Sequence, residues 1–293
     1  LNPIAVELAE VSLWLNAIFK GSHVPWFGLQ LYNGNSLVGA RREVFSTAQL
    51  TPGKGENGLP ERDWRAAAPV AVAFPPGPFV GEGQGERAGL SVTDVFHFLL
   101  PAEGMGMVSD KVVKAMELAA FEQFNQWRKA FTVPLTKDEV RRVQTLSQAA
   151  EKLWQQHAEE LARVRKATCD ELHVWPDPAA NSAPTSTAQK DAIYQREMLS
   201  EEQKNASPYR RLKLVMDAWC ALWFWPLDKA SELPSREHWW FVLEAVLLGN
   251  ASLINALADD LFPETQPQQG LNFTPERDRY GHVDIAALIE ALP

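Results

Sequence analysis

Two asparagines near the start of the chain are the first residues whose setting suggests ligand chemistry. Asn2 stands before Pro3 and Ile4, and Asn35 lies in the turn sequence GNSLVG. Asn2 suits a helix N-cap, and Pro3 suits the first helical position. A helix between two strands is half of a βαβ unit, and doubly wound sheets bind ligands at the carboxyl ends of their strands. We therefore expect both amides to lie at one edge and to hydrogen-bond a nucleoside.

Four groups of basic residues are candidate phosphate contacts, because Lys and Arg side chains position proteins on nucleic acids in this way. The groups are Arg41 and Arg42; Arg141 and Arg142; Arg163, Arg165 and Lys166; and Arg210, Arg211 and Lys213. The last group is the first choice for DNA binding, since its helix start also offers backbone donors, and the second group is retained beside it. The alternative for each group is a solvated helix face paired with nearby carboxylates.

Metal chemistry has weaker support. Cys169 and His173 are spaced i, i+4, but no second pair stands at zinc-ligand spacing. Asp259 and Asp260 are adjacent on a predicted helix, so their side chains point apart. No nucleophile-elbow motif is present either. The sequence thus favours no metal site and no nucleophilic triad.

The segment NPIAVELAEVSLWL (2–15), followed by a predicted strand and GNSLVG, resembles a known family. It is similar to the N6-adenine-specific DNA methyltransferases of large fused restriction–modification and phage-defence enzymes, including the BREX and DISARM types. The resemblance covers about the first 40 residues. It implies a Rossmann-like fold that transfers a methyl group from S-adenosylmethionine to adenine N6 in DNA. The remaining residues correspond to the long variable insert of such enzymes.

The resemblance also implies cofactor-binding roles. Asn2, Pro3 and Ile4 match the segment that lines the adenine of the cofactor. Asn35 matches a position, usually Asp, that meets the adenine amino group, where an amide oxygen can also accept. The acid that binds the ribose would precede Leu1, and the Asn-Pro-Pro-aromatic motif that holds a flipped adenine does not occur. We expect an internal piece of a longer enzyme, inactive alone and unable to bind S-adenosylmethionine alone.

The first 106 residues predict one helix and several short strands. Apolar residues recur at helical spacing at the start, which predicts a helix with one buried face made of Ile4, Leu8, Val11, Leu15 and Ile18. Alternating or continuous apolar runs predict strands at 28–33, 67–74 and 94–101. Gly and Pro dominate the rest of residues 51–89 and predict loops.

Beyond residue 106 the sequence predicts helices. One runs from Ser109 to about Phe131, and the capping box TKDE opens a second that reaches Leu172. The two are expected to form an antiparallel hairpin that projects from a body. Further helix starts are predicted at 200–203, Ser207, Ser235 and Asn250. The adjacent Trp239 and Trp240 would pack in a core or, less commonly, stack on bases.

Composition sets broad limits. The 293 residues carry 28 basic and 37 acidic side chains, a net charge of −9, which argues against a surface built broadly to neutralise phosphate. Cys169 and Cys220 stand alone, which suggests a reducing compartment. No apolar run has membrane-spanning length and no signal peptide is found, so we expect a cytoplasmic protein.

The sequence therefore predicts a mainly α fold with a small α/β remnant, the helical insert of a Rossmann-like methyltransferase. The expected segments are a partial cofactor-binding region, a Gly/Pro-rich loop with short strands, a helical hairpin, and a linker with a helical subdomain, at 1–40, 41–106, 107–174 and 175–293. The expected function is adenine-specific DNA methylation by the longer protein, with the helical part aiding DNA recognition. The alternative is a helical protein–protein interaction module of a defence complex that touches no DNA. An unrelated helical enzyme has no convergent catalytic set to support it. Neither metal nor membrane partners are expected.

Overall fold

The computed structural model describes residues 3–18, 25–34, 38–51, 63–73, 87–107, 111–170, 185–198 and 207–248. The described part is mainly helical with one small sheet, which confirms the mainly α prediction. The chain divides into two compact units. Unit 1 contains Leu1–Val38 and Gln155–Ser207, and unit 2 contains Gly39–Trp154 and Pro208–Pro293. Each unit joins two stretches that are distant along the chain.

Unit 1 contains helix α1 (Pro3–Ala17), the end of α5 (Lys137–Thr168) and α6 (Thr187–Met198). The first helix is confirmed, but none of its residues is buried, so its apolar face is exposed rather than packed. The strand predicted at 28–33 is wrong, because residues 28–30 form a turn. Polar contacts hold α6: the Trp26 indole donates to Asp191 at 2.8 Å, and Lys190 pairs with Asp170 at 2.5 Å.

Unit 2 contains a sheet of four short strands in the order β3-β2-β1-β4. The strands are β1 (Glu43–Ser46), β2 (Val70–Ala73), β3 (Arg87–Ala88) and β4 (Asp94–Phe96). Strand β1 runs antiparallel to both β2 and β4, whereas β2 and β3 are parallel. The strands predicted at 67–74 and 94–101 are thus present in shorter form, and β1 was not predicted. The central pairs are antiparallel, unlike those of a doubly wound parallel sheet.

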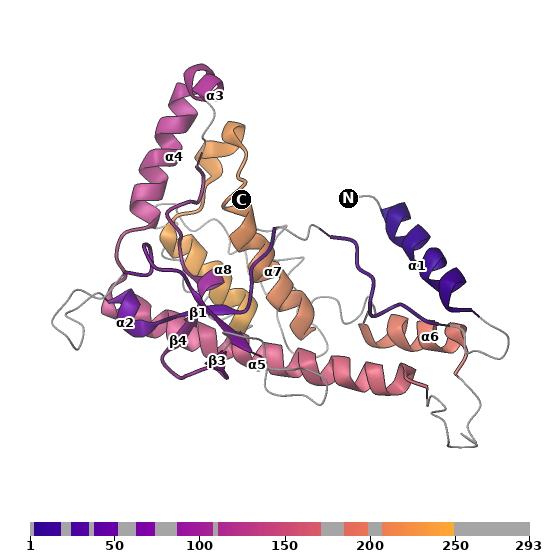
Figure 1. Ribbon diagram of the computed structural model, residues 1–293. Helices are drawn as coiled ribbons and strands as arrows, with labels where there is room; N and C mark the ends of the chain where they lie inside the picture. Colours follow the sequence, from indigo (N-terminus) through magenta and orange to yellow (C-terminus); the bar gives the residue numbers. More distant parts are fainter. Residues whose placement is uncertain are drawn as a thin grey trace, which may run out of the picture. The chain divides into compact units, whose positions relative to one another are not determined.

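The helix predicted from Ser109 is two helices, α3 (Lys111–Met116) and α4 (Leu118–Phe131), which meet at Glu117; Ser109 itself lies outside the described residues. The capping box of α5 is confirmed. The Thr136 backbone N–H donates to Glu139 at 2.7 Å, and the Glu139 N–H donates to the Thr136 hydroxyl at 3.2 Å. The antiparallel hairpin is wrong, because α4 packs on the 3₁₀ segment η3 (Leu227–Glu232) and diverges from α5 (Figure 1).

Helices α7 (Pro208–Ala221) and α8 (Arg236–Leu248) pack on each other and begin close to the predicted positions. Trp239 and Trp240 are buried in the core of unit 2, so core packing, rather than base stacking, is their role. Strand β4 continues into the 3₁₀ turn η1 (His97–Leu99), which contacts α7. The helix starts predicted at 200–203 and Asn250 lie outside the described residues.

Candidate functional site

The predicted cofactor residues are only partly described. Pro3 and Ile4 form the first turn of α1, and Ile4 is 59% exposed. Asn2 and Asn35 lie outside the described residues. The nucleoside edge that these four residues would form therefore stays a prediction.

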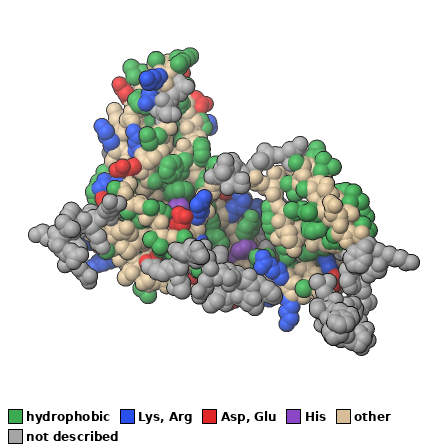
Figure 2. Space-filling model, viewed as in Figure 1, with side chains coloured by type: hydrophobic (Ala, Val, Ile, Leu, Met, Phe, Trp, Pro, Cys, Tyr) green, Lys and Arg blue, Asp and Glu red, His purple; other side chains and the backbone are tan. Residues whose placement is uncertain are grey.

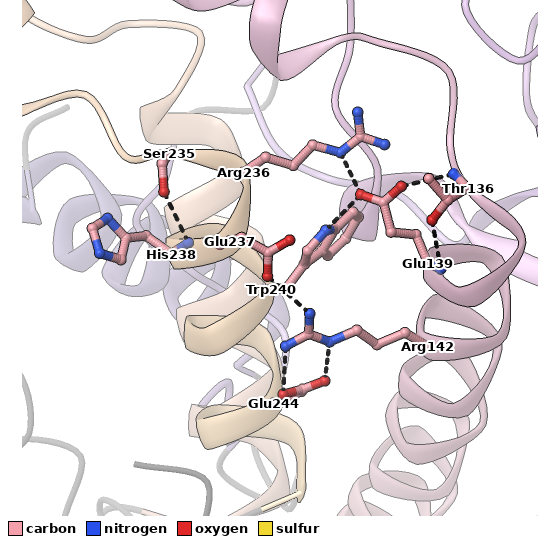
Figure 3. Close-up of polar contacts among 9 residues, drawn as sticks. All are labelled: Thr136, Glu139, Arg142, Ser235, Arg236, Glu237, His238, Trp240 and Glu244. Atoms are coloured by element: carbon pink, nitrogen blue, oxygen red, sulfur yellow. Dashed lines mark hydrogen bonds and ion pairs between the residues drawn. The ribbon is translucent and has the colours of Figure 1, made fainter. Parts of the chain in front are cut away.

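Arg142, a predicted DNA contact, is held at the junction of α5 and α8 (Figure 3). Its guanidinium forms a two-pronged pair with Glu244, with Nη2 donating to Oε2 at 2.9 Å and Nε contacting Oε1. A third bond runs from Nη1 to Glu237 at 3.2 Å. The hydrogen bond to Glu244, more than burial, sets the balance and raises the pKa of Arg142. The charge of this residue is thus compensated within the fold, and its described role is to join two helices.

Glu139 organises the other half of this junction. Besides capping α5, it accepts from the Trp240 indole at 3.1 Å and pairs with Arg236 at 2.8 Å (Figure 3). Burial acts to raise the pKa of Glu139, but the hydrogen bonds from Thr136 and Trp240 and the charge of Arg236 outweigh it and lower the pKa. A hollow of about 540 Å³ lies beside these groups. Because arginines and carboxylates line it together, no single charge dominates it.

The group at the start of α7 is divided by burial. Arg211 is 6% exposed, and its guanidinium donates to the carbonyls of Val246 at 2.7 Å and Leu247 at 2.9 Å. These carbonyls belong to the last turn of α8, where no helical donor remains for them. The guanidinium of Arg211 is thus used inside the fold, where it caps α8, and its contact with phosphate stays a prediction without support from this geometry. Arg210 is exposed, and the exposed Lys213 pairs with Asp217 one turn on.

The remaining basic residues also differ in how far their side chains are exposed to solvent. Arg141 is exposed and pairs with Asp138 at 3.3 Å. Arg42 is buried and donates to Glu151 at 2.9 Å, whereas Arg41 is exposed. The group formed by Arg163, Arg165 and Lys166 lies exposed along the unit 1 end of α5. Only the exposed members keep the geometry that a phosphate contact needs.

The described residues give no further support to metal or membrane chemistry. Cys169 is exposed, while its predicted companion His173 and the pair Asp259 and Asp260 lie outside the described ranges. Within those ranges no three His, Cys, Asp or Glu side chains are grouped as metal ligands would be. The helices searched in the same ranges include none with the length and apolar character to cross a bilayer.

An aromatic cavity in unit 2 was not predicted from the sequence. It has a volume of about 380 Å³, and its walls include Glu43, Trp64, His97, Trp219 and Trp223. Three indoles hold residues 99–101, which enter the wall at Leu100, by donating to three successive carbonyls. Trp239 binds the Leu99 carbonyl at 3.0 Å, Trp219 binds that of Leu100 at 3.0 Å, and Trp64 binds that of Pro101 at 3.1 Å.

His97 is the histidine in the wall of this cavity, which also holds carboxylates and arginines. Its Nε2 lies 3.0 Å from the Arg41 carbonyl oxygen, and its ring meets Trp219 edge-on with centroids 4.9 Å apart. Burial lowers the pKa of His97, so the ring is neutral at pH 7. Its position inside an apolar run, DVFHFLL, was the one sequence signal. The tryptophans come from distant segments, so no local pattern brings them together.

Comparison with known proteins gives no relative. No family model matches the chain, and neither a curated protein nor a solved structure matches it significantly.

Proposed function

We propose that this chain is part of an adenine-specific DNA methyltransferase that uses S-adenosylmethionine. The observation that carries the proposal is the first helix. Its sequence, PIAVELAEVSLWL, belongs to the segment that resembles the family, and its apolar side chains are exposed. Figure 2 shows these hydrophobic side chains gathered over α1.

The exposure has a physical meaning. Ile4 is 59% exposed, Leu8 61% and Leu15 60%. Burying one such side chain contributes about 1.5–3 kcal/mol, so a helix with several of them gains stability from an apolar surface to pack on. In a doubly wound methyltransferase, the parallel sheet provides that surface. The exposed face of α1 therefore supports a place for this helix against such a sheet.

The test uses the longest natural protein that contains this chain. It is incubated with DNA and isotopically labelled S-adenosylmethionine, and we expect N6-methyladenine by mass spectrometry. Asn35→Ala should weaken cofactor binding at least tenfold by calorimetry, because it removes the predicted adenine contact. Asn16→Ala is the matched control, since the exposed Asn16 donates to the Ser12 carbonyl on its own helix. A protein that methylates no adenine, or equal loss in both variants, would overturn the proposal.

A second candidate function, docking of a protein partner by unit 2, is favoured by a specific observation. Four exposed apolar side chains lie around α3, where Met107 is 64%, Val112 67%, Met116 76% and Leu118 60% exposed. In the same unit Arg142 and Arg211 are used in internal contacts. Val112→Ser with Met116→Ser would abolish co-purification of a natural subunit if this surface docks one. If this double substitution instead reduces retention on duplex DNA and leaves co-purification intact, the proposal of a protein-docking surface is rejected.

A further inference from the structure

The aromatic cavity in unit 2 has the size of a site for one small ligand. Its volume of about 380 Å³ lies at the lower end of the range for small-molecule pockets, about 300–1,000 Å³. Its walls come from β1 and the residues before it, from the turn that carries Trp64, from η1 with the turn that follows it, and from the end of α7 with Trp223 just beyond. All of these belong to one compact unit, so their relative positions are fixed by one core.

Two half-buried tryptophans give the cavity its planar surfaces. The rings of Trp219 and Trp223 have centroids 5.5 Å apart and planes inclined at 59°. The hydrogen bond from Trp219 to the Leu100 carbonyl fixes the first ring. The second ring, that of Trp223, lies directly against the backbone of Gly104. Only glycine permits this contact, since a Cβ at position 104 would lie 2.4 Å from the ring. Preorganised aromatic faces of this kind stack on planar ligands and accept any nucleobase.

The polar groups of the cavity are mixed in sign. Glu43 is mostly buried, with 23% of its side chain exposed, and Arg41 is 77% exposed with its Nη1 3.9 Å from Glu43. Arg65 is bound to Asp63 at 2.5 Å and stacks over Trp64. A buried carboxylate accepts from an amino group, whereas an exposed guanidinium attracts an anion. Arg41 and Arg65 are balanced by Glu43 and Glu103 in the walls, so the exposed Arg41, rather than the cavity as a whole, attracts the anion. The aromatic walls also suit an organic cation, which the test below therefore includes.

We propose that this cavity binds one nucleotide, with the base stacked on Trp223 and its edge against the inclined ring of Trp219. Its exocyclic amine faces Glu43, and its phosphate lies near the exposed Arg41. This inference goes beyond the proposed methyl transfer. It depends on the geometry of unit 2 alone, so the two can fail separately.

The test is a calorimetric titration of the full 293-residue chain with adenosine 5′-monophosphate. Cytidine 5′-monophosphate is titrated in the same way to test a nucleotide with a different base. Ribose 5-phosphate lacks the base and choline supplies a cation alone. We expect both nucleotides to bind with millimolar or tighter affinity and the other two probes to bind at least tenfold more weakly. Binding of choline without the nucleotides, equal binding of ribose 5-phosphate, or no binding of either nucleotide would overturn the proposal.

Two variants locate the binding. Trp223→Leu removes an aromatic face and keeps an apolar side chain, and should weaken nucleotide binding at least tenfold. Phe224→Leu is the matched control, because this neighbouring ring is 68% exposed and does not line the cavity; its affinity should stay within twofold of the parent. Near-ultraviolet circular dichroism checks that both fold. Glu43→Gln keeps the size of the side chain and removes its charge. It should lower the affinity for adenosine monophosphate and leave ribose 5-phosphate binding unchanged. Equal affinity in Trp223→Leu and Phe224→Leu would place the ligand elsewhere and reject the proposal.

Discussion

The two ends of α5 carry the same kind of residue and use it in opposite ways. In unit 2, Arg142 is bound by Glu244 and Glu237 of α8. At the unit 1 end, Arg163, Arg165 and Lys166 are exposed. The local sequences are similar, a pair or trio of basic residues on one helix. What differs is the element that faces them, so a basic cluster indicates a nucleic-acid contact only after its neighbours are known.

The largest expected effect comes from breaking the α5–α8 junction. Arg142→Ala leaves the carboxylate of Glu244, which has 8% of its side chain exposed, without its partner. Losing one partner of a buried pair costs about 3–5 kcal/mol. Because 25% of the Arg142 side chain is exposed, we expect about 2–3 kcal/mol less stability of unit 2, measured by urea unfolding. Arg141→Ala is the control and should change stability by less than about 0.5 kcal/mol. Equal effects of the two substitutions would show that the pair with Glu244 is not formed.

The start of α7 repeats this contrast between neighbouring residues. Arg211→Met keeps the buried stem but leaves the carbonyls of Val246 and Leu247 without their donor. An unsatisfied buried polar group costs about 1–3 kcal/mol, so we expect a loss of that order in urea unfolding, with faster amide hydrogen exchange at the end of α8. Arg210→Met, at an exposed position, should leave both measurements unchanged. Unaltered exchange in Arg211→Met would contradict the capping role.

These contrasts show what the sequence can and cannot predict. The capping box at Thr136 and Glu139 was predicted because it is local, with both partners three residues apart. The role of Arg211 depends on carbonyls 35 and 36 residues away, which no local pattern encodes. The division at Glu117 was missed because the apolar spacing continues across it.

The candidate sites follow the same rule. His97 and Trp219 are separated by more than a hundred residues, yet their ring centroids lie 4.9 Å apart. Only the packing of η1 on α7 brings them together. The first helix shows the opposite error: helical periodicity predicted a buried apolar face, whereas no residue of α1 is buried, because periodicity places a helix but does not supply a surface to cover it.

Glu139, at the junction of α5 and α8, should give a smaller effect on the free energy of unfolding, and one that depends on pH. Folding lowers the pKa of Glu139 from 4.5, chiefly because hydrogen bonds and Arg236 outweigh burial. A carboxyl group with a depressed pKa stabilises the folded state above its unfolded pKa, and this contribution is lost as pH falls through the folded pKa. Because Gln keeps one acceptor oxygen, Glu139→Gln should cost about 1 kcal/mol at pH 7, the net worth of one hydrogen bond, and less near pH 3. Urea unfolding across this pH range measures the difference. A cost that stays constant with pH would mean that the carboxylate charge does not contribute.

The smallest stability effect is expected at the unit 1 end of α5, where the comparison is sharpest in function. Replacing Arg163, Arg165 and Lys166 by Gln removes three exposed charges and should change stability by less than about 0.5 kcal/mol per site. If this face contacts phosphate, retention of the chain on duplex DNA at low salt should fall, and the salt dependence of binding should lose about one charge per contact removed. The matched control replaces Lys129, Lys137 and Lys152 by Gln, which removes three exposed charges in unit 2 at positions with no predicted DNA contact and should leave retention unchanged. A chain of net charge −9 needs a local basic face to bind phosphate. Equal losses of DNA retention in both variants would show that retention follows net charge and that this end of α5 is not such a face.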